Sequence, residues 1–266
     1  MYKATWHSLP VAVKRLKGVN THCSNTLQEL ANEAGMLSSL RHPNVVLFLG
    51  IVLTHEYCAV VTEFMNGGSV RDMLDDVQEA AKAGAVAGAL APLSDPIRLL
   101  VLRDTARGMV HLHASGVIHR DMKTQNLLTD HKTRPRAVKV CDFGLCTYKE
   151  RFSKKTLTAV GTPQYTAPEV LRRDGYSEKA DVYSFGVVMW ELYQTDGKFP
   201  FEDMSALRAA HEVAYSGLRP LPDVPEETTP SWVRRLIGKC WVSDPNDRPS
   251  FVNILSVIEG AGGGSV

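Results

Sequence analysis

The chain has 266 residues, of which 44% are hydrophobic and 22% are charged, and its formal net charge is +1. This composition is typical of a folded enzyme and excludes a disordered chain. The balanced charge gives no support to binding of nucleic acid or of an anionic membrane surface. The longest apolar stretch, residues 45–53, is less than half as long as a membrane-spanning helix, so we expect no membrane insertion.

The cysteines are scattered and odd in number, and they lack paired short spacing. They are Cys23, Cys58, Cys141, Cys146 and Cys240. Such a set argues against a disulfide framework and against a zinc site, and it favours a reducing compartment. The N-terminus also lacks the charged and apolar regions of a secretory signal. We therefore predict a soluble, cytoplasmic protein.

The first quarter of the chain is predicted to contain strands around one helix. Aromatic and β-branched residues predict strands at residues 2–6, 11–16, 45–53 and 57–62. A turn at residues 7–10 separates the first two strands. Thr26 and Glu29 have the spacing of a capping box, which predicts a helix from there to about Leu40.

The remainder of the chain is predicted to be mostly helical. Ser69 with Asp72 can cap one helix, and Asp95 before Pro96 predicts a helix that ends near Ala114. Further helices are predicted at residues 179–195, 205–215, 231–240 and 250–259. We interpret residues 80–91 as a surface insertion and residues 260–266 as a flexible tail, because both are rich in small residues.

Residue types that can handle phosphate and metal ions occur in short motifs. The most specific is residues 119–126, His-Arg-Asp-Met-Lys-Thr-Gln-Asn, which places a base, two cations and an amide close together after an apolar pair. Asp142-Phe143-Gly144 follows a predicted strand at residues 137–141. Gly161-Thr162-Pro163 and Ala167-Pro168-Glu169 come later, and Val11-Ala12-Val13-Lys14 places a lysine on a strand near the N-terminus.

The order and spacing of these motifs resemble a eukaryotic protein kinase catalytic domain, from Met1 to about Ile258. The chain is most similar to the tyrosine-kinase-like serine/threonine group, which includes Raf-like and mixed-lineage kinases. Trp6, residues 40–46 and the segment from Cys240 to Pro249 carry this finer likeness. The resemblance implies an α+β, bilobal kinase domain at residues 1–259. Its parts would be a small strand-rich N-lobe with one main helix (1–62), a hinge (63–68) and a larger helical C-lobe (69–259).

The resemblance also implies roles for charged residues. Phosphoryl transfer depends mostly on positioning and charge stabilisation. Asp121 would accept the proton of the substrate hydroxyl, and Lys123 would offset charge on the transferred phosphate. Lys14 would contact the α- and β-phosphates of ATP, held by a carboxylate from the N-lobe helix. Glu33 is the expected partner, and Glu29, one turn earlier, is the alternative that fits better as a helix cap.

The cofactors implied are ATP and Mg²⁺. Asn126 and Asp142 would hold the metal, because magnesium prefers hard oxygen ligands. Ala12 and Leu128 would enclose the adenine ring, with Thr62 as the gatekeeper. The remaining nucleotide-binding positions implied by the resemblance are Glu63, Met65 and Ser69.

Several structural roles follow from the same resemblance. Leu37, Phe48, His119 and Phe143 would form an apolar spine between the lobes. Arg248 would pair with Glu169, and Asp181 would brace the catalytic loop.

Substrate preference and regulation are also implied. Lys123 and the substrate-loop residue Thr162 resemble serine/threonine kinases, so the expected partners are proteins with Ser or Thr acceptors. Ser69 stands where some basic-directed kinases carry an acid, so no preference for an upstream arginine is expected. Ser153, Thr156 and Thr158 are candidate phosphosites for an upstream activating kinase. A phosphate there would pair with Arg120 and order the loop.

The first strand and the glycine-rich loop of the kinase pattern have no counterpart in this sequence. We expect the chain to be part of a longer polypeptide, with a genuinely truncated product as the alternative. Two other functions stay open: a silent pseudokinase or scaffold, and a small-molecule kinase. The combined set of Lys14, Glu33, Asp121, Asn126 and Asp142 favours the enzyme, and the absent loop favours the scaffold.

Overall fold

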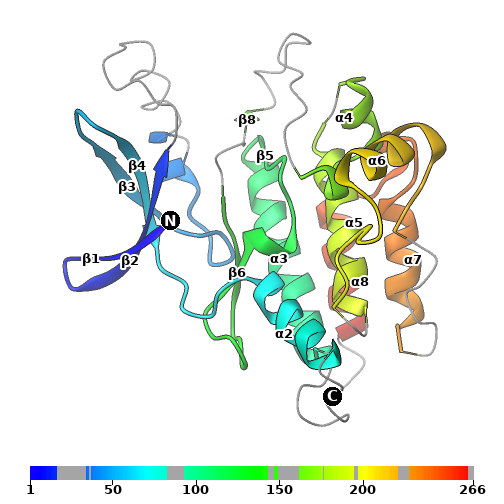
Figure 1. The fold of residues 1–266 in the computed structure, drawn as a ribbon, viewed down its shortest axis with the longest axis horizontal. Coiled ribbons are helices and arrows are strands. Elements are labelled where there is room, and N and C mark those ends of the chain that lie inside the picture. Colours follow the sequence, from blue (N-terminus) through cyan, green and yellow to red (C-terminus); the bar gives the residue numbers. More distant parts are fainter. Residues whose placement is uncertain are drawn as a thin grey trace.

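The computed structural model describes residues 1–16, 34–35, 37–82, 93–142, 147–148, 162–175, 177–194, 197–220 and 228–262. These residues form two lobes (Figure 1). Strands β1 to β4 make the N-lobe, helices α2 to α8 make the C-lobe, and the short strands β5 and β6 lie near the boundary. The predicted α+β, bilobal architecture is therefore confirmed.

The N-lobe is one antiparallel sheet with strand order β1-β2-β4-β3. Its strands are β1 (Tyr2–Trp6), β2 (Leu9–Leu16), β3 (Phe48–Leu53) and β4 (Cys58–Glu63). The turn between β1 and β2 is shorter than predicted, because only His7 and Ser8 lie outside the ladder. Both have positive φ (45° and 64°), which suits the twist of a two-residue hairpin.

Strand β3 begins at Phe48. The apolar run in the sequence had predicted a start three residues earlier, at Val45. Val45 pairs with Val140 in a parallel bridge, and the amide of Val46 donates to the carbonyl of Val140 (2.9 Å). The amide of Val140 in turn donates to the carbonyl of Asn44 (2.9 Å). These residues therefore connect the N-lobe to the C-lobe and are not available to extend the sheet.

The predicted N-lobe helix lies largely outside the described residues. Residues 34–35 and 37–39 are helical, and Leu40, where the helix was expected to end, is not. Leu37, inside this helical stretch, and Leu40, directly after it, are both buried.

Helix α2 (Val70–Lys82) begins at the predicted capping box. The amide of Ser69 donates to Asp72 Oδ2 (2.7 Å), and the amide of Asp72 donates to Ser69 Oγ (3.1 Å). Helix α3 (Asp95–Ala114) has Ser94, and not Asp95, at its cap position, with Pro96 in the first turn. Residues 80–82, the start of the predicted insertion, form the last turn of α2 instead. Residues 83–92 lie outside the described residues.

The rest of the C-lobe is built from short strands and from further helices. The strands are β5 (Val117–Ile118), β6 (Leu127–Thr129), β7 (Val138–Val140) and β8 (Thr147–Tyr148). The helices are α4 (Pro168–Arg172), α5 (Lys179–Tyr193), α6 (Ala206–His211), α7 (Ser231–Cys240) and α8 (Phe251–Gly262). Single turns of 3₁₀ helix, η1 (Thr124–Asn126), η4 (Pro163–Tyr165) and η6 (Pro245–Asp247), lie between them.

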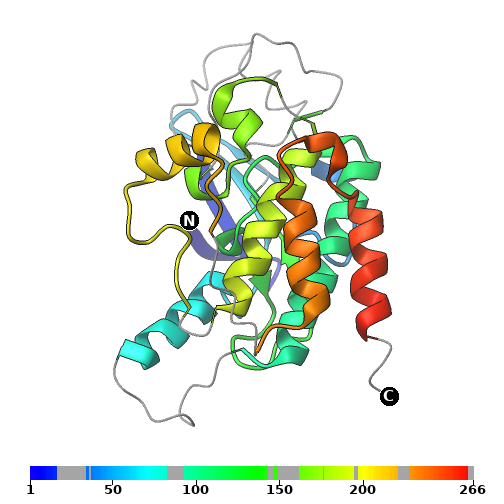
Figure 2. The ribbon, with the colours of Figure 1, turned by 90° about the vertical axis from the view of Figure 1, so that its right-hand side faces the viewer.

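Helix α5 forms the centre of the C-lobe, and nearly every residue in it is buried. Helix α7 packs on α5 and α8 packs on α3 (orange and red in Figure 2). The helix predicted at residues 205–215 is divided into α6 and a five-residue π-helix, η5 (Glu212–Ser216). Helix α8 extends to Gly262, past its predicted end, and residues 263–266 are outside the description.

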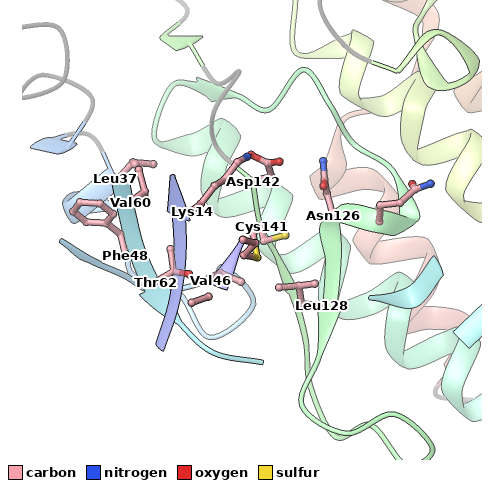
Figure 3. A pocket seen from close by; sticks show the side chains of 13 residues that line it. Lys14, Leu37, Val46, Phe48, Val60, Thr62, Asn126, Leu128, Cys141 and Asp142 are labelled. Atoms are coloured by element: carbon pink, nitrogen blue, oxygen red, sulfur yellow. The ribbon is translucent and has the colours of Figure 1, made fainter. Parts of the chain in front are cut away.

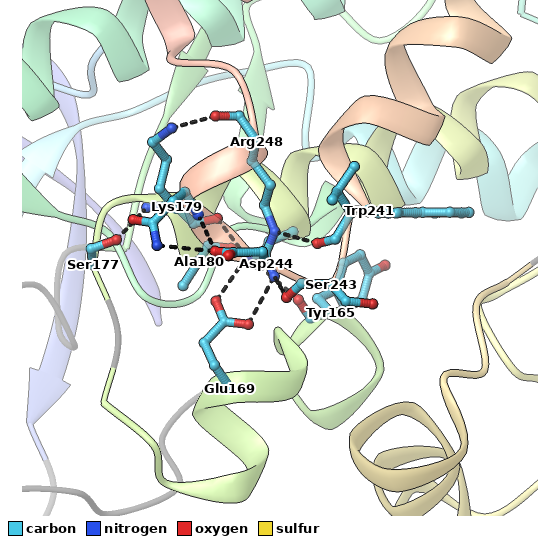
Figure 4. A network of polar contacts seen from close by, with 12 residues as sticks. Tyr165, Glu169, Ser177, Lys179, Ala180, Trp241, Ser243, Asp244 and Arg248 are labelled. Carbon is cyan, nitrogen blue, oxygen red and sulfur yellow. Dashed lines mark hydrogen bonds and ion pairs between the residues drawn. The ribbon is translucent and has the colours of Figure 1, made fainter.

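A buried ion pair joins α4 to the C-terminal part of the chain (Figure 4). Arg248 donates from Nη1 and Nη2 to the two carboxylate oxygens of Glu169 (2.7 and 2.8 Å), which confirms the predicted pair. Arg248 also donates to the carbonyls of Val242 (2.9 Å) and Lys179 (3.0 Å). Arg248 therefore fixes α4, α5 and the segment before α8 to one another.

Among the described helices, none combines the length and the apolar character needed to cross a membrane.

Candidate active site

A cavity of about 200 Å³ lies between the two lobes. Both lobes contribute apolar side chains to it, and Figure 3 shows Phe48, Val60 and Thr62 from the N-lobe across from Leu128 and Asn126. The complete lining is Met1, Ala12, Lys14, Leu37, Val46, Phe48, Val60, Thr62, Gln125, Asn126, Leu128, Cys141 and Asp142. An apolar slot with a few polar groups at one end suits a flat heterocycle that carries charged substituents.

The polar end of this cavity contains an ion pair between Lys14 of β2 and Asp142, which follows β7. The two side chains point toward one another (Figure 3), and each is about one third exposed (38% and 31%). Asp142 has a left-handed backbone (φ 65°). Non-glycine residues in this region are uncommon and cluster at functional sites, so the conformation supports the role implied for Asp142.

Asp121 and its neighbours form a compact polar cluster beside the cavity. Asp121 Oδ1 accepts hydrogen bonds from the amide and from Oγ1 of Thr162 (3.1 and 3.0 Å). Lys123 Nζ lies 2.8 Å from Asp121 Oδ2 and donates to Thr162 Oγ1 (2.7 Å). Asn126 Nδ2 donates to the carbonyl and to Oδ2 of Asp121 (2.7 and 3.1 Å). The predicted base, cation, amide and substrate-loop hydroxyl are therefore in direct contact.

Asp181 of α5 holds the backbone at the start of this loop, as predicted. Its two carboxylate oxygens accept from the amides of His119 and Arg120 (both 2.9 Å), and Oδ2 also lies 2.8 Å from His113 Nε2. Arg120 has a positive φ (71°), and the bond from its amide fixes this uncommon conformation. Burial alone would raise the pKa of Asp181, but the hydrogen bond and charge of His113 hold that pKa below its ordinary value.

His119 and Cys141 connect the loop to the cavity. His119 is fully buried, and its Nε2 lies 2.9 Å from the carbonyl of Cys141. The amide of Cys141 donates to the carbonyl of Asn126 (2.9 Å). Burial raises the pKa of Cys141 to about 12, so this cavity-lining thiol stays protonated. Leu37 and Phe48, two other residues of the predicted spine, also line the cavity.

The predicted hinge begins inside β4, because Glu63 is the last residue of that strand. The Glu63 carboxylate accepts from Lys139 Nζ of β7 (2.7 and 2.8 Å) and from the amide of Leu47 (2.7 Å). Glu63, Met65 and Ser69 do not line the cavity, although Thr62 does. The Ser69 hydroxyl accepts a hydrogen bond from the backbone amide of Asp72 at the start of α2, so it is engaged in capping.

Several predicted residues lie outside the described part of the chain. They are Thr26, Glu29, Glu33, Phe143, Gly144, Ser153, Thr156, Thr158 and Gly161. The partner implied for Lys14 and the candidate phosphosites therefore stay predictions.

Some residues at the site were not found from the sequence. Val46 and Val60 line the cavity, but the sequence identified them only as residues of predicted strands. Gln125 lies within the motif at residues 119–126 and Cys141 directly precedes Asp142, but neither was given a role at the site. Lys139 had no local signal at all, because its pairing with Glu63 spans distant segments. An ion pair of this kind is visible only once the two strands are placed.

The donor set at the polar end of the cavity fits a magnesium nucleotide. Asn126 and Asp142 both line the cavity and offer the hard oxygen ligands that magnesium prefers. Both hydrogen bonds of Asn126 to Asp121 use the amide nitrogen, so they do not consume its amide oxygen. Lys14 adds a positive charge beside Asp142, which suits phosphate oxygens.

Two lobes, a slot between them, a Lys–Asp pair at its polar end and an Asp–Lys–Asn loop together define a protein kinase domain. The chain belongs to the family described as "Protein tyrosine and serine/threonine kinase", whose model matches residues 1–258. The sequence-based resemblance is thereby confirmed.

Known proteins similar to this chain include several serine/threonine kinases. A probable serine/threonine-protein kinase, drkC of Dictyostelium discoideum, is 40% identical over 263 residues, covering 97% of this chain and 32% of the relative. The serine/threonine-protein kinase CTR1 of Arabidopsis thaliana is 36% identical over 260 residues, covering 97% of this chain and 29% of the relative. The serine/threonine-protein kinase STY46 of Arabidopsis thaliana is 37% identical over 259 residues, covering 97% of this chain and 41% of the relative. The chain thus spans less than half the length of each.

Proposed function

We propose that this domain transfers the terminal phosphate of magnesium-ATP to Ser or Thr hydroxyls of protein substrates, in cytoplasmic signalling. The observation that carries the proposal is the cluster in which Asp121, Lys123 and Thr162 meet beside the cavity. An aliphatic hydroxyl, that of Thr162, already lies within hydrogen-bond reach of both the carboxylate and the ammonium group. The names of the relatives support Ser and Thr as acceptors.

The residues of the chain divide the work of phosphoryl transfer. Asp121 accepts the proton of the acceptor hydroxyl at a carboxylate oxygen, and Lys123 stabilises negative charge beside it. Lys14 would orient phosphate oxygens at the polar end of the cavity, and Asn126 and Asp142 would hold the metal. The apolar walls, including Ala12 and Leu128, exclude water from the nucleotide. ATP supplies the phosphoryl group, and magnesium offsets its charge.

The direct test is phosphate transfer from radiolabelled magnesium-ATP to a mixed protein substrate, with Asp121→Asn as the comparison. We expect transfer to serine and threonine, and a loss of about 10²–10⁴-fold in Asp121→Asn, the range for removal of a general base. Phosphotyrosine as the main product would overturn the acceptor class. A folded chain with no Asp121-dependent transfer would favour the pseudokinase or scaffold instead.

Regulation by an upstream kinase is part of the same proposal. Ser153, Thr156 and Thr158 are its candidate sites, and a phosphate there would be attracted to Arg120. Phosphate mapping of active protein that found all three unmodified would remove this part of the proposal and leave the activity itself intact.

A further inference from the structure

Two histidine rings stack on one another where the lobes meet. His42 lies in the segment before β3, and His111 lies in the last turn of α3. Their ring centroids are 5.0 Å apart, and their planes are inclined by 17°. Neither ring lines the nucleotide cavity, so the stack is a feature separate from the candidate active site.

The ring of His42 holds a backbone turn. The amide of Asn44 donates to His42 Nδ1 (3.1 Å), and the amide of Val45 donates to the His42 carbonyl (3.1 Å). A ring nitrogen accepts a hydrogen bond only while it carries no proton. The turn as observed therefore requires a neutral His42 ring.

The same turn is bonded to β7 of the C-lobe. Asn44 is buried, and its Nδ2 donates to the carbonyl of Val138 (3.0 Å). The Asn44 carbonyl accepts from the amide of Val140 (2.9 Å). Asp142, one of the two residues expected to hold the metal, follows Val140 by two positions. A continuous set of hydrogen bonds thus connects the ring of His42 with the segment that carries Asp142.

The surroundings of His42 oppose a positive charge on its ring. Burial, the charge of His111 and the charge of Arg107 lower the pKa of His42, and Asp104 acts in the opposite direction. These three side chains of α3 are the titratable and charged groups that act on His42 within the described part of the chain.

The two permanently charged neighbours are both engaged elsewhere. Arg107 donates to Glu259 of α8 (3.2 and 2.7 Å). Asp104 Oδ1 accepts from Arg103 (3.2 and 3.1 Å), and its Oδ2 accepts from the amide of Val138 (3.1 Å). The one acidic group near the stack is thereby already satisfied by other donors.

A proton on His111 would also have no acceptor. Its Nε2 is buried and has no hydrogen-bond partner among the described residues. Both nitrogens of a cationic imidazole are donors, so this one would become a buried, unsatisfied donor. Two cationic rings at 5.0 Å would in addition repel one another. A proton on either ring therefore weakens the stack.

We propose that the stack of His42 on His111 is a pH-sensitive switch at the junction of the lobes. Near neutral pH both rings are uncharged, and the turn holds β7. As the pH falls through the ordinary range of histidine, a proton from solvent adds at His42 Nδ1, the bond from the Asn44 amide is lost, and the rings separate. The loosened turn releases the segment that carries Asp142, and phosphate transfer slows. This last step rests on the proposed kinase activity, whereas the opening of the turn rests on the contacts alone.

The chain offers two variants and a matched control. His42→Asn places an amide oxygen where Nδ1 stood, and asparagine commonly accepts from the backbone two residues on, so it keeps the turn without titrating. His111→Phe keeps a stacked ring that takes up no proton. His131→Asn is the control, because His131 Nδ1 likewise accepts from backbone amides, those of Thr133 and Arg134 (both 3.3 Å), on an exposed turn between β6 and β7.

Amide hydrogen exchange tests the switch without any need for activity. Exchange at residues 44–46 and 138–141 is compared between about pH 7.5 and about pH 5.5, after division by the intrinsic rate at each pH. In the wild type, protection should fall about 2–10-fold on acidification, the effect of one lost neutral hydrogen bond. His42→Asn should keep its protection, and His131→Asn should behave as the wild type. His111→Phe, in which one ring of the stack still titrates, should lose less than the wild type, and it carries the test if His42→Asn does not fold.

The pH profile of phosphate transfer is the second measurement. The ratio of the rate of His42→Asn to that of the wild type should rise about 2–10-fold over the same interval, because only the wild type loses the turn. Groups that titrate in both proteins cancel in this ratio. The corresponding ratio for His131→Asn should stay flat.

The outcomes separate the switch from the activity. The expected exchange pattern in a chain without Asp121-dependent transfer would support the switch and defeat only the proposed activity. An equal loss of protection in the wild type and in His42→Asn would overturn the switch. So would a loss that extends equally over α5, because it would report general unfolding in acid. A flat rate ratio in a chain whose transfer does depend on Asp121 would overturn the link from the switch to catalysis.

Discussion

Lys14 and Asp142 form a direct ion pair across the boundary between the lobes, although they are 128 positions apart in the sequence. Lys14 lies on a strand of the N-lobe sheet, and Asp142 follows β7 of the C-lobe. Both are partly exposed, and pairs of that kind contribute only about 0–1 kcal/mol to stability. The pair is therefore better explained by the two charged groups that it places at the cavity than by its contribution to the stability of the fold.

Lys14→Met is expected to abolish most phosphate transfer while leaving the fold intact. The loss of a charge that contacts phosphate should lower kcat/KM for ATP by about 10²-fold or more. The free energy of unfolding in urea should change by about 1 kcal/mol or less. Lys132→Met is the control, because Lys132 makes an exposed pair with Asp76 (2.8 Å) away from the cavity. Normal transfer by Lys14→Met would contradict the assigned role.

Glu169→Gln should be among the most destabilising substitutions in the C-lobe. It leaves the guanidinium of Arg248, whose side chain is 0% exposed, without its counter-charge. Breaking a buried pair in this way costs about 3–5 kcal/mol. Urea unfolding of Glu169→Gln measures this loss in the free energy of unfolding. Glu259→Gln removes a carboxylate from the exposed pair with Arg107 (2.7 Å) and should cost less than about 1 kcal/mol. Equal losses in the two variants would mean that burial does not decide the outcome.

Gly186→Ala and Gly238→Ala should shift stability in opposite directions, although both glycines are helical. A Cβ at Gly186 of α5 would lie 2.5 Å from Trp241 Nε1 and 2.9 Å from Cys240 Cβ, so we expect a loss of about 1–3 kcal/mol. A Cβ at Gly238 of α7 meets nothing within 4 Å, and alanine there should add about 0.5–1 kcal/mol. Thermal unfolding of the two variants measures both. A stabilised Gly186→Ala would contradict the close packing of α5 on α7.

The stability of the protein should carry a pH dependence that belongs to Glu191. Burial raises the pKa of Glu191 from 4.5 to about 7, against the hydrogen bond from Tyr165 and the charge of Arg71. A carboxyl whose pKa is raised on folding contributes stability that is present below its unfolded pKa and is lost as the pH rises through the folded value. The difference in unfolding free energy, wild type minus Glu191→Gln, should therefore fall between pH 4.5 and 7.

The difference between the two proteins is the quantity to measure, because other groups titrate in the opposite sense. The pKa of His42 is lowered by burial and by the nearby charges of His111 and Arg107, and that of Asp181 is held low by His113. Their contributions are lost as the pH falls, and they cancel in the comparison. A flat difference across the window would mean that Glu191 is ionised throughout.

Local features of the fold were predictable because they depend on neighbours in the sequence. The capping box of Ser69 and Asp72 forms with both of its hydrogen bonds, and α7 covers the residues predicted for it. The start of α3 is displaced by one position, because a proline fits more than one site in the first turn of a helix. The π-helix after α6 has no periodicity that would distinguish it from an α-helix.

The sequence by itself determined the family, the motif residues, the four strands of the N-lobe and the long helices of the C-lobe, because spacing along the chain carries that information. The short strands β5, β6 and β8 and the short helix α4 were not predicted. Only the tertiary structure decided which distant groups meet: Lys14 with Asp142, Lys139 with Glu63, and Glu191 with Thr124 and Tyr165. These contacts depend on how the sheet, α2 and α5 pack, and packing is set by the complete core. A buried carboxylate such as Glu191 is therefore indistinguishable in the sequence from a solvated one until the fold shows what surrounds it.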